Sequence, residues 1–321
     1  MSFLRRVKYK LRKREIWTVA IYKLVGDFNF NFITHGDLIL KISDFGQTYS
    51  KRYRAICADP FIIIDKNYLY VFFETKSEFE KGKVSCVSFE LSDTNRFYDY
   101  GVVLEEDFHL SFPNVFRLFD DYYMVPESAE AGNVFLYISR DFPNNWQRLK
   151  VLVNHPIVDV SVFFSDGVHL VGTDKAGRLL HYYSPDLLSE FVLVENVKYT
   201  NLKANRNGGN IFNFRGESYR VVQVGNNYYG ERLCFRQINT INNIEYSEFE
   251  VDLVIENPGK NFMNLGYHHL SMASDGDDTW VAIDGFRKDT FFNLLCFLFL
   301  KFTTRVMGGI KIIFSMLSSR V

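Results

Sequence analysis

One pattern of apolar and polar positions recurs through the middle of the chain, from about residue 57 to residue 285. Each unit has a polar or Pro/Gly-marked start, a short apolar strand, a turn with Asp, Asn or Gly, and a second, aromatic strand. Short apolar runs bounded by turn residues are typical of β-strands. The predicted strand pairs span 59–64 and 68–74, 111–116 and 122–127, 159–164 and 168–173, 209–214 and 218–223, and 269–273 and 279–284.

These strand pairs follow one another at intervals of roughly 45 to 60 residues, the length of a four-stranded propeller blade. Residues 17–22 predict a further strand that closes the ring. An all-β sandwich is the alternative, but the long repeat argues against it. The sequence therefore predicts an all-β, five-bladed β-propeller over residues 16–288. A basic N-terminal arm at 1–15 and an apolar, basic and helical segment at 289–321 flank it.

The aromatic content, the net charge and the cysteines add to this picture. The 32 Phe and 19 Tyr favour strands, and aromatic rings also stack on the C–H faces of sugars. A net charge of −1 gives no indication of nucleic-acid binding. The four cysteines lack disulfide-like or metal-like spacing and fit a reducing cytoplasm.

The two ends of the chain differ from the middle in charge and hydropathy. Seven Lys and Arg residues lie between positions 5 and 14, and no signal peptide is recognisable. The apolar run at 291–300 is too short to span a bilayer and is interrupted by Lys301 and Arg305. Together the ends predict peripheral attachment to anionic lipid at the cytoplasmic, inner face of a membrane. The alternative is that 291–321 packs on the propeller or on a second subunit.

The candidate functional residues lie where the strands of each pair begin or end. In a propeller the first strand of every blade lines the central channel, so the starts of these strands converge on one face. Carboxylates, histidines and arginine at this place suit a sugar or sugar phosphate. The strand starts supply Asp59, His109, Ser111, Asp159, Arg206, Gly209, His268 and His269, and the ends of second strands supply Glu74 and Glu127.

Each of these features also has a purely structural interpretation. Asp59 before a proline can start a strand or turn, and Glu74 and Glu127 can be solvated rim residues. Gly209 and the glycine before it can form a bulge. The histidines lack metal-ligand spacing, so no metal and no cofactor is expected, and hydrogen-bonding or acid/base roles fit them better. Two residues on one strand, Arg220 and Gln223, would face opposite sides, so that at most one of them meets the channel.

Several longer motifs carry a family resemblance. The stretches 58–61, 70–76, 101–113, 124–128, 206–209 and 268–270, together with Arg220, Gln223 and Tyr229, resemble the N-terminal domain of plant glucosamine inositolphosphorylceramide transferases. The likeness covers roughly residues 55–285. More distantly, the chain resembles five-bladed glycosidases that cleave arabinose, xylose and fructose linkages. The plant proteins carry a second, nucleotide-sugar-type transferase domain, for which we expect no room in this chain.

The resemblance to the glycosidases implies an Asp base on the first blade, a tuning Asp on a middle blade and a Glu acid at the start of a later blade. Asp59 and Asp159 match the first two, but residues 206–209 contain no Glu. Hydrolysis normally needs a carboxylic acid to protonate the leaving oxygen, and only Glu127 or Glu74 could take the place of the missing Glu.

We therefore expect a carbohydrate-active protein of the glycosyltransferase type in glycolipid or surface polysaccharide biosynthesis. Asp59, Glu127 and Asp159 are the expected catalytic residues. The expected substrate-binding residues are Glu74, His109, Ser111, Arg206, Gly209, Arg220, Gln223, Tyr229, His268 and His269. The alternatives are a non-catalytic sugar-binding module that partners a separate transferase, and a glycoside hydrolase.

Overall fold

The computed structural model describes residues 15–42, 56–76, 80–199, 205–225, 227–255, 260 and 262–288. One compact unit spans Trp17–Phe286. The predicted basic arm, apart from its last residue, and the predicted C-terminal helical segment lie outside the described residues. Among the helices that are described, none is long and apolar enough to cross a membrane.

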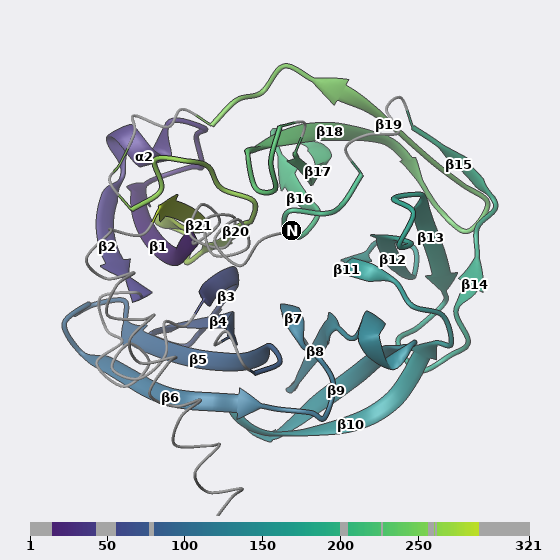
Figure 1. Cartoon of the computed structure of the whole chain (residues 1–321), viewed down its shortest axis with the longest axis horizontal. Coiled ribbons are helices and arrows are strands. Elements are labelled where there is room, and N and C mark those ends of the chain that lie inside the picture. The colour runs from purple at the N-terminus through teal and green to yellow at the C-terminus, as the bar shows by residue number, and fades with distance from the viewer. Residues whose placement is uncertain are drawn as a thin grey trace, which may run out of the picture. The chain divides into compact units, whose positions relative to one another are not determined.

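The described residues form five β-sheets arranged in a ring around a central axis, as Figure 1 shows. From the axis outward, the first blade contains β3 (Ile56–Asp65), β4 (Tyr68–Lys76), β5 (Lys83–Glu90) and β6 (Phe97–Leu104). The second contains β7 (Ser111–Leu118), β8 (Asp121–Glu127), β9 (Val134–Asp141) and β10 (Asn144–Val153). The third contains β11 (Val158–Phe164), β12 (Val168–Thr173), β13 (Leu179–Ser184) and β14 (Val192–Leu193). The fourth contains β16 (Phe212–Phe214), β17 (Glu217–Val224), β18 (Arg232–Ile241), β19 (Glu245–Val251) and the parallel β15 (Asn196–Lys198).

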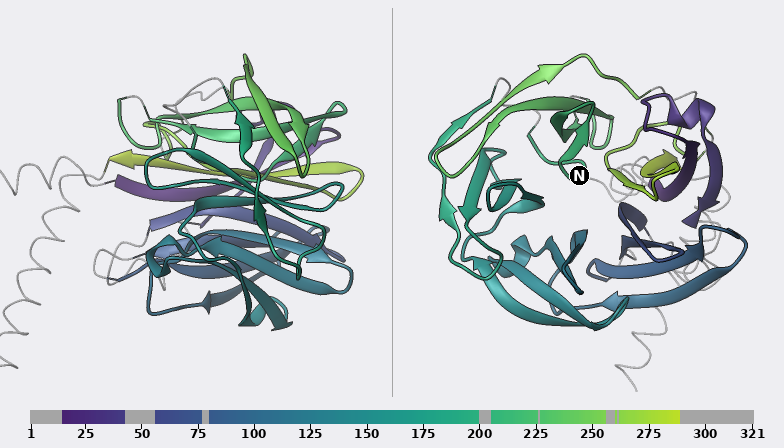
Figure 2. Two further views of the ribbon diagram at one scale, coloured as in Figure 1. Left: turned by 90° about the vertical axis from the view of Figure 1, so that its right-hand side faces the viewer. Right: turned by 180° about the vertical axis from the view of Figure 1, so that it is seen from behind.

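The fifth blade closes the ring with strands from both ends of the propeller. Its order is β20 (Leu270–Ser274), β21 (Asp278–Lys288), β1 (Glu15–Val25) and β2 (Asp37–Lys41), so β1 lies between β21 and β2 (Figure 2). A short helix, α2 (Phe32–His35), connects β1 to β2. The predicted five-bladed propeller and its closing strand are therefore confirmed.

Aromatic side chains fill the space between neighbouring blades. Phe61 of β3 packs edge-on against Phe112 of β7, with ring centroids 4.8 Å apart. Phe72 of β4 packs against Trp146 of β10 in the same way, at 5.8 Å. A fully buried side chain of this size stabilises the fold by roughly 1.5–3 kcal/mol. The many phenylalanines therefore serve mainly as the core between blades.

The inner strands of three blades share a bulge where they begin. The strand register shifts between Ala58 and Phe61 in β3, and β7 and β11 shift at the corresponding place. Asp59, Phe112 and Asp159 occupy these bulges with φ of 52°, 46° and 50°. A left-handed conformation costs a residue with a side chain roughly 1 kcal/mol or more, and a bulge turns that side chain away from the regular pleat. Two aspartates are thereby re-aimed at the same level of the channel.

Candidate functional site

The second strands of the blades bring a ring of polar side chains to the same level. Glu74 lies opposite Ala58, Glu127 opposite Ser111 and Thr173 opposite Val158, immediately before each bulge. In the fourth blade the backbone N–H of Gln223 donates to the carbonyl of Arg206, and in the fifth that of Asp284 donates to the carbonyl of His269. The repeat thus places Glu74, Glu127, Thr173, Gln223 and Asp284 at equivalent positions. With Asp59 and Asp159, their acidic members form the carboxylate cluster: Asp59, Glu74, Glu127, Asp159 and Asp284.

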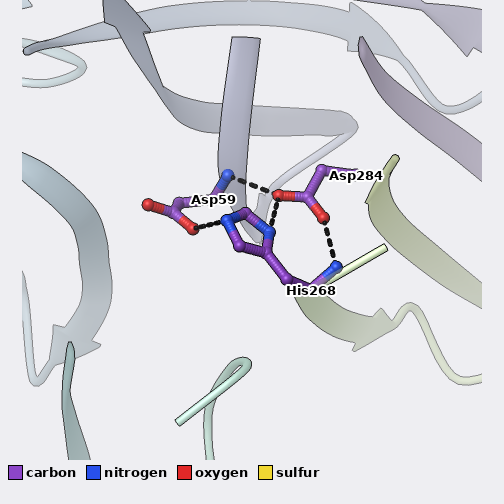
Figure 3. Close-up of side chains that lie close together, drawn as sticks. All are labelled: Asp59, His268 and Asp284. Carbon is purple, nitrogen blue, oxygen red and sulfur yellow. Dashed lines mark hydrogen bonds and ion pairs between the residues drawn. The ribbon is translucent and has the colours of Figure 1, made fainter. Parts of the chain in front are cut away.

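Three buried side chains from the first and fifth blades form one connected group (Figure 3). His268 Nδ1 lies 2.6 Å from Asp284 Oδ2, and His268 Nε2 lies 3.6 Å from Asp59 Oδ1. The backbone N–H of Asp59 donates to Asp284 Oδ2 at 3.0 Å. The backbone N–H of Phe112 donates to Asp59 Oδ2 at 3.2 Å, so the bulges of two blades meet at this carboxylate.

Burial and neighbouring charges separate the protonation states of these groups. Burial alone would lower the pKa of His268, but the close contact with the charged Asp284 and the charge of Asp59 together outweigh burial and raise that pKa to about 9. Burial raises the pKa of Asp59 to about 7, against the opposing charge of His268. His269 is also buried, and desolvation lowers its pKa to about 3. At neutral pH, therefore, His268 is a cation, His269 is neutral and Asp59 is close to its midpoint.

A metal ion is the other occupant to consider for this group. One ligand atom from each of Asp59, His268 and Asp284 lies within 4.8 Å of the others. Both oxygens of Asp284 already accept hydrogen bonds, since Oδ1 receives the backbone N–H groups of His268 and His269 at 3.0 and 2.9 Å. His268 lies between two carboxylates, with Nδ1 2.6 Å from Asp284 and Nε2 3.6 Å from Asp59. This arrangement fits an imidazolium paired with two carboxylates, and we do not assign these residues as metal ligands.

The third and fourth blades supply the other half of the site. Arg206 Nε donates to Asp159 Oδ2 at 2.7 Å, and Gln223 Nε2 donates to the same oxygen at 3.1 Å. The backbone N–H of Asp159 faces Glu127 Oε2 at 3.3 Å. Burial would raise the pKa of Asp159, but Arg206 holds it below its usual value. Burial and the charge of Asp159 raise the pKa of Glu127 well above its usual value.

Arg206 keeps part of its side chain exposed beside these carboxylates. Its side chain remains 41% exposed, and Nη2 lies 3.8 Å from Glu127 Oε2. The guanidinium carbon lies 5.6 Å from the ring centre of Tyr229, which is half exposed. An arginine fixed through Nε with its terminal nitrogens accessible is suited to binding phosphate or carboxylate.

Glu74 and His109 form a pair at the edge of this group. His109 Nδ1 accepts the backbone N–H of Gly82 at 2.9 Å, so the ring proton resides on Nε2, which lies 3.6 Å from Glu74 Oε1. A Cβ at Gly82 would come within 2.6 Å of Glu74 Oε1, so the glycine makes room for the pair. Burial, assisted by the charge of Asp59, raises the pKa of Glu74 to about 8.

The remaining predicted residues lie apart from the ligand-accessible atoms. Arg220 is fully buried and donates to Glu248, to the carbonyl of Asn205 and to the side chain of Asn207. Of the two candidates on β17, Gln223 is thus the one that reaches the site. Gly209 has φ of 144°, and a Cβ there would lie 2.0 Å from the carbonyl oxygen of Leu270, so this glycine lets two blades approach closely.

Two more predicted residues contribute to the wall of the site. His269 is fully buried and packs edge-on against Phe61 and Phe112 at 4.6 and 5.0 Å. Ser111 is buried opposite Glu127. Asp284 was missed from the sequence, although it ends the second strand of its pair just as Glu74 and Glu127 end theirs. The repeat itself was the signal that could have found it.

This geometry defines a class of protein: a five-bladed β-propeller with a buried, carboxylate-rich polar site where its inner strands begin. Residues 32–285 match the family described as glucosamine inositolphosphorylceramide transferase 1, N-terminal, and the chain belongs to this family. The resemblance expected from the motifs is confirmed.

Two curated relatives carry the full name of this family. The Arabidopsis thaliana glucosamine inositolphosphorylceramide transferase 1 is 33% identical over 246 residues, covering 72% of this chain and 32% of the relative. The Oryza sativa subsp. japonica protein of the same name is 32% identical over 245 residues, covering 72% and 33%. The chain therefore spans about a third of the length of these relatives.

Solved structures of similar fold include propeller glycosidases. RS223-β-xylosidase superposes with a TM-score of 0.52 at 12% identity, covering 75% of this chain and 97% of that chain. The catalytic domain of a Coprinopsis cinerea α-L-arabinofuranosidase superposes with a TM-score of 0.50 at 15% identity, covering 73% and 92%. At such identities the likeness shows the fold alone.

Proposed function

We propose that this propeller binds a sugar at the mouth of its channel and takes part in glycosyl transfer to a glycolipid or surface polysaccharide acceptor. The observation that carries the proposal is the split in protonation among adjacent carboxylates. Arg206 holds the pKa of Asp159 below its usual value, burial raises the pKa of Glu127 well above its usual value, and burial raises that of Asp59 to about 7. Such a split among neighbouring acids suits acid/base chemistry at neutral pH. Membership in a family named for a transferase supports the same class of reaction.

Each residue then has a distinct role in the proposed reaction. The acceptor hydroxyl gives its proton to Asp59 Oδ1, and its oxygen attacks the anomeric carbon of an activated sugar. The bond to the leaving group breaks, and its electron pair departs on that group. Arg206 stabilises an anionic leaving group, while Glu127 donates a hydrogen bond or a proton to its oxygen. Glu74 and His109 face sugar hydroxyls.

A non-catalytic sugar-binding module is the second candidate. The absence of an acid from residues 206–209 favours it over hydrolysis. The carboxylates and Arg206 can orient hydroxyls without proton transfer, and a module of this kind would present an acceptor to a separate transferase.

A screen of nucleotide-activated sugars with a membrane lipid extract separates the candidates. We expect product from the wild type, a loss of kcat of about 10²- to 10⁴-fold in Asp59→Asn and Glu127→Gln, and no change in Asp121→Asn, an exposed control on β8. If the wild type turns over and both site variants match it, the assigned site is wrong. Binding of glycans without turnover would support the module, and release of free sugar would support a hydrolase.

We also propose that the protein attaches peripherally to anionic lipid on the cytoplasmic face of a membrane. The support is the composition of the ends, since each basic residue near an anionic surface contributes about 1 kcal/mol. Co-sedimentation with phosphatidylserine vesicles, compared with phosphatidylcholine vesicles, tests this for the full chain and for a deletion of residues 1–14. Equal binding to both vesicles would contradict the proposal.

A further inference from the structure

His268 lies between two carboxylates, and its contacts differ on the two sides. Asp284 Oδ2 is 2.6 Å from Nδ1, whereas Asp59 Oδ1 is 3.6 Å from Nε2. Resting on the proposed function, we propose that Asp284 and His268 are positioning residues that form a relay holding the carboxylate of Asp59 for reaction. In this view His268 acts through Asp59 and does not bind the sugar itself.

Asp284 is the anchor of the relay because its hydrogen-bonding capacity is fully used. Its two oxygens receive the backbone N–H groups of Asp59, His268 and His269 and face the imidazole Nδ1. The side chain is fully buried on β21, the strand adjoining β20. A carboxylate held by three backbone donors has one orientation, and its ion pair with Nδ1 at 2.6 Å therefore restrains the imidazole ring.

The imidazole of His268 is also held on its faces by aromatic rings. Trp17 of β1 lies over it with centroids 4.3 Å apart, and Tyr229 packs edge-on at 5.0 Å. A Cβ at Gly230 would lie 2.6 Å from the Trp17 ring, so there is little room for Trp17 to move. β1, the strand that closes the propeller, thus also restrains the imidazole ring of His268 through Trp17.

Asp59 has one oxygen bound and one oxygen left for reaction. Oδ2 accepts the backbone N–H of Phe112, and Oδ1 faces His268 Nε2 and His269 Nδ1, each at 3.6 Å. This distance is too long for a hydrogen bond but within ion-pair range. Catalytic contacts that are long in a ligand-free site often tighten when substrate is bound. Oδ1 is therefore the atom that accepts the proton, with the relay as its fixed counter-charge.

The charges around His268 favour its cationic form. Asp59 and Asp284 face its two nitrogens, and Asp159 adds a third negative charge within the same site. The opposing influences are the guanidinium of Arg206 and the desolvation of the ring, while His269 and Tyr229 are neutral neighbours. The pKa of about 9 for His268 agrees with the geometry.

Two substitutions separate the two sides of the relay. His268→Asn places an amide nitrogen near the position of Nδ1 and can still donate to Asp284, but it cannot reach Asp59. His268→Gln places its amide nitrogen near Nε2 and keeps an N–H donor facing Asp59. His35→Gln, an exposed histidine on α2, is the matched control.

NMR of the sugar-free protein labelled with ¹⁵N-histidine and ¹³C-aspartate tests the relay without any substrate. We expect His268 to show a doubly protonated ring through pH 8 and Asp59 to titrate near pH 7. In His268→Asn, Asp59 becomes a weaker acid by about tenfold or more, because the neighbouring positive charge is gone. In the transfer assay this variant loses at least about tenfold in kcat, and His268→Gln recovers part of the loss.

Three results would overturn the relay: a neutral His268 at pH 7, an unchanged Asp59 titration in His268→Asn, or displacement of the His268 proton by millimolar Ca²⁺, Mg²⁺ or Zn²⁺, which would indicate a metal site. Melting temperatures of all variants exclude misfolding as the cause. If no donor turns over but the NMR result holds, the proposed function fails and the relay stands.

Discussion

Two buried clusters of charge lie in this propeller, and their contacts differ. In the carboxylate cluster Asp59 accepts a hydrogen bond at Oδ2 and faces two histidines with Oδ1 at 3.6 Å, and the neighbouring Arg206 keeps 41% of its side chain exposed. In the fourth blade, the Glu248 cluster consists of Arg220, Arg236, Tyr246 and Glu248. Arg220 holds Glu248 through two bonds of 2.7 and 2.5 Å, and the Tyr246 hydroxyl donates to Glu248 at 2.6 Å.

This comparison shows that burial and charge alone do not identify a functional site. Both clusters lie almost completely out of solvent, and both perturb the pKa values of their members. In the Glu248 cluster the anion is matched by two arginines, and its ion pairs join three strands of one blade, β17, β18 and β19. In the carboxylate cluster acids outnumber the cations, so protons have to remain on some of them. The excess of carboxylates over cations therefore distinguishes the candidate functional site from the Glu248 cluster.

Neutralising Glu248 gives the largest expected effect on this contrast. Glu248→Gln leaves the guanidinium of Arg220 buried without its counter-charge, which costs about 3–5 kcal/mol in the free energy of unfolding. Chemical denaturation at pH 7 measures this loss. Glu250→Gln, two residues along the same strand and exposed, is the control and should change the free energy of unfolding by less than about 0.5 kcal/mol. A Glu248→Gln variant as stable as its control would remove the distinction between the clusters.

Most of the fold was predictable from the sequence because it depends on a repeated local pattern. Each apolar strand pair with a turn between its strands is recognisable by itself, and five of them at a regular interval specify a propeller. Residues 17–22 were recognised as the closing strand for the same reason. The register of each pair also brought Asp59, Glu74, Glu127 and Asp159 to one level, as expected.

The site was less predictable where side-chain direction depends on distant contacts. Arg220 and Gln223 were equivalent candidates in the sequence, and only the position of Glu248 on β19, two strands away in the same sheet, shows why Arg220 turns away from the site. The inward aim of Asp59 and Asp159 depends on a bulge that places them in a left-handed conformation, which no residue type predicts. Asp284 was overlooked because its role lies in its contacts with three backbone N–H groups and with the imidazole of His268, which the sequence does not show.

The pH dependence of stability sharpens the comparison further. The pKa of Asp59 is raised by burial to about 7, so between its ordinary value and pH 7 the folded state keeps a proton that the unfolded state has released. The contribution of Asp59 to the free energy of unfolding therefore falls as pH rises, by up to about 1.4 kcal/mol per pH unit. Asp59→Asn removes this term, and its stability relative to the wild type should increase from pH 4 to pH 7.

Glu248 gives the opposite expectation in the same measurement. Although burial opposes ionisation, Arg220 keeps its pKa below the usual value, so it is ionised in both states above about pH 5. The deficit of Glu248→Gln should then be constant from pH 5 to pH 8 and shrink only in acid. Denaturation curves at each pH for the wild type and both variants provide the test. Parallel pH profiles for the two variants would contradict the assigned protonation states.

The smallest expected effect is a gain in stability from Glu127→Gln. Burial and the charge of Asp159 raise the pKa of Glu127 well above its usual value, and a glutamine has the same shape and can donate to Asp159 in its place. At pH 7 folding therefore shifts Glu127 toward its protonated form, at a cost in free energy that the variant does not have. We expect a melting temperature about 2 °C higher at pH 7, equivalent to about 1 kcal/mol, and no difference near pH 4. Glu190→Gln, which is exposed, should show no such change at either pH.

A loss of stability at pH 7 would mean that Glu127 is ionised and held by Arg206, and it could then not serve as the proton donor. A gain in stability combined with the loss of transfer would instead show that the fold tolerates this strained carboxylate for the sake of its chemistry.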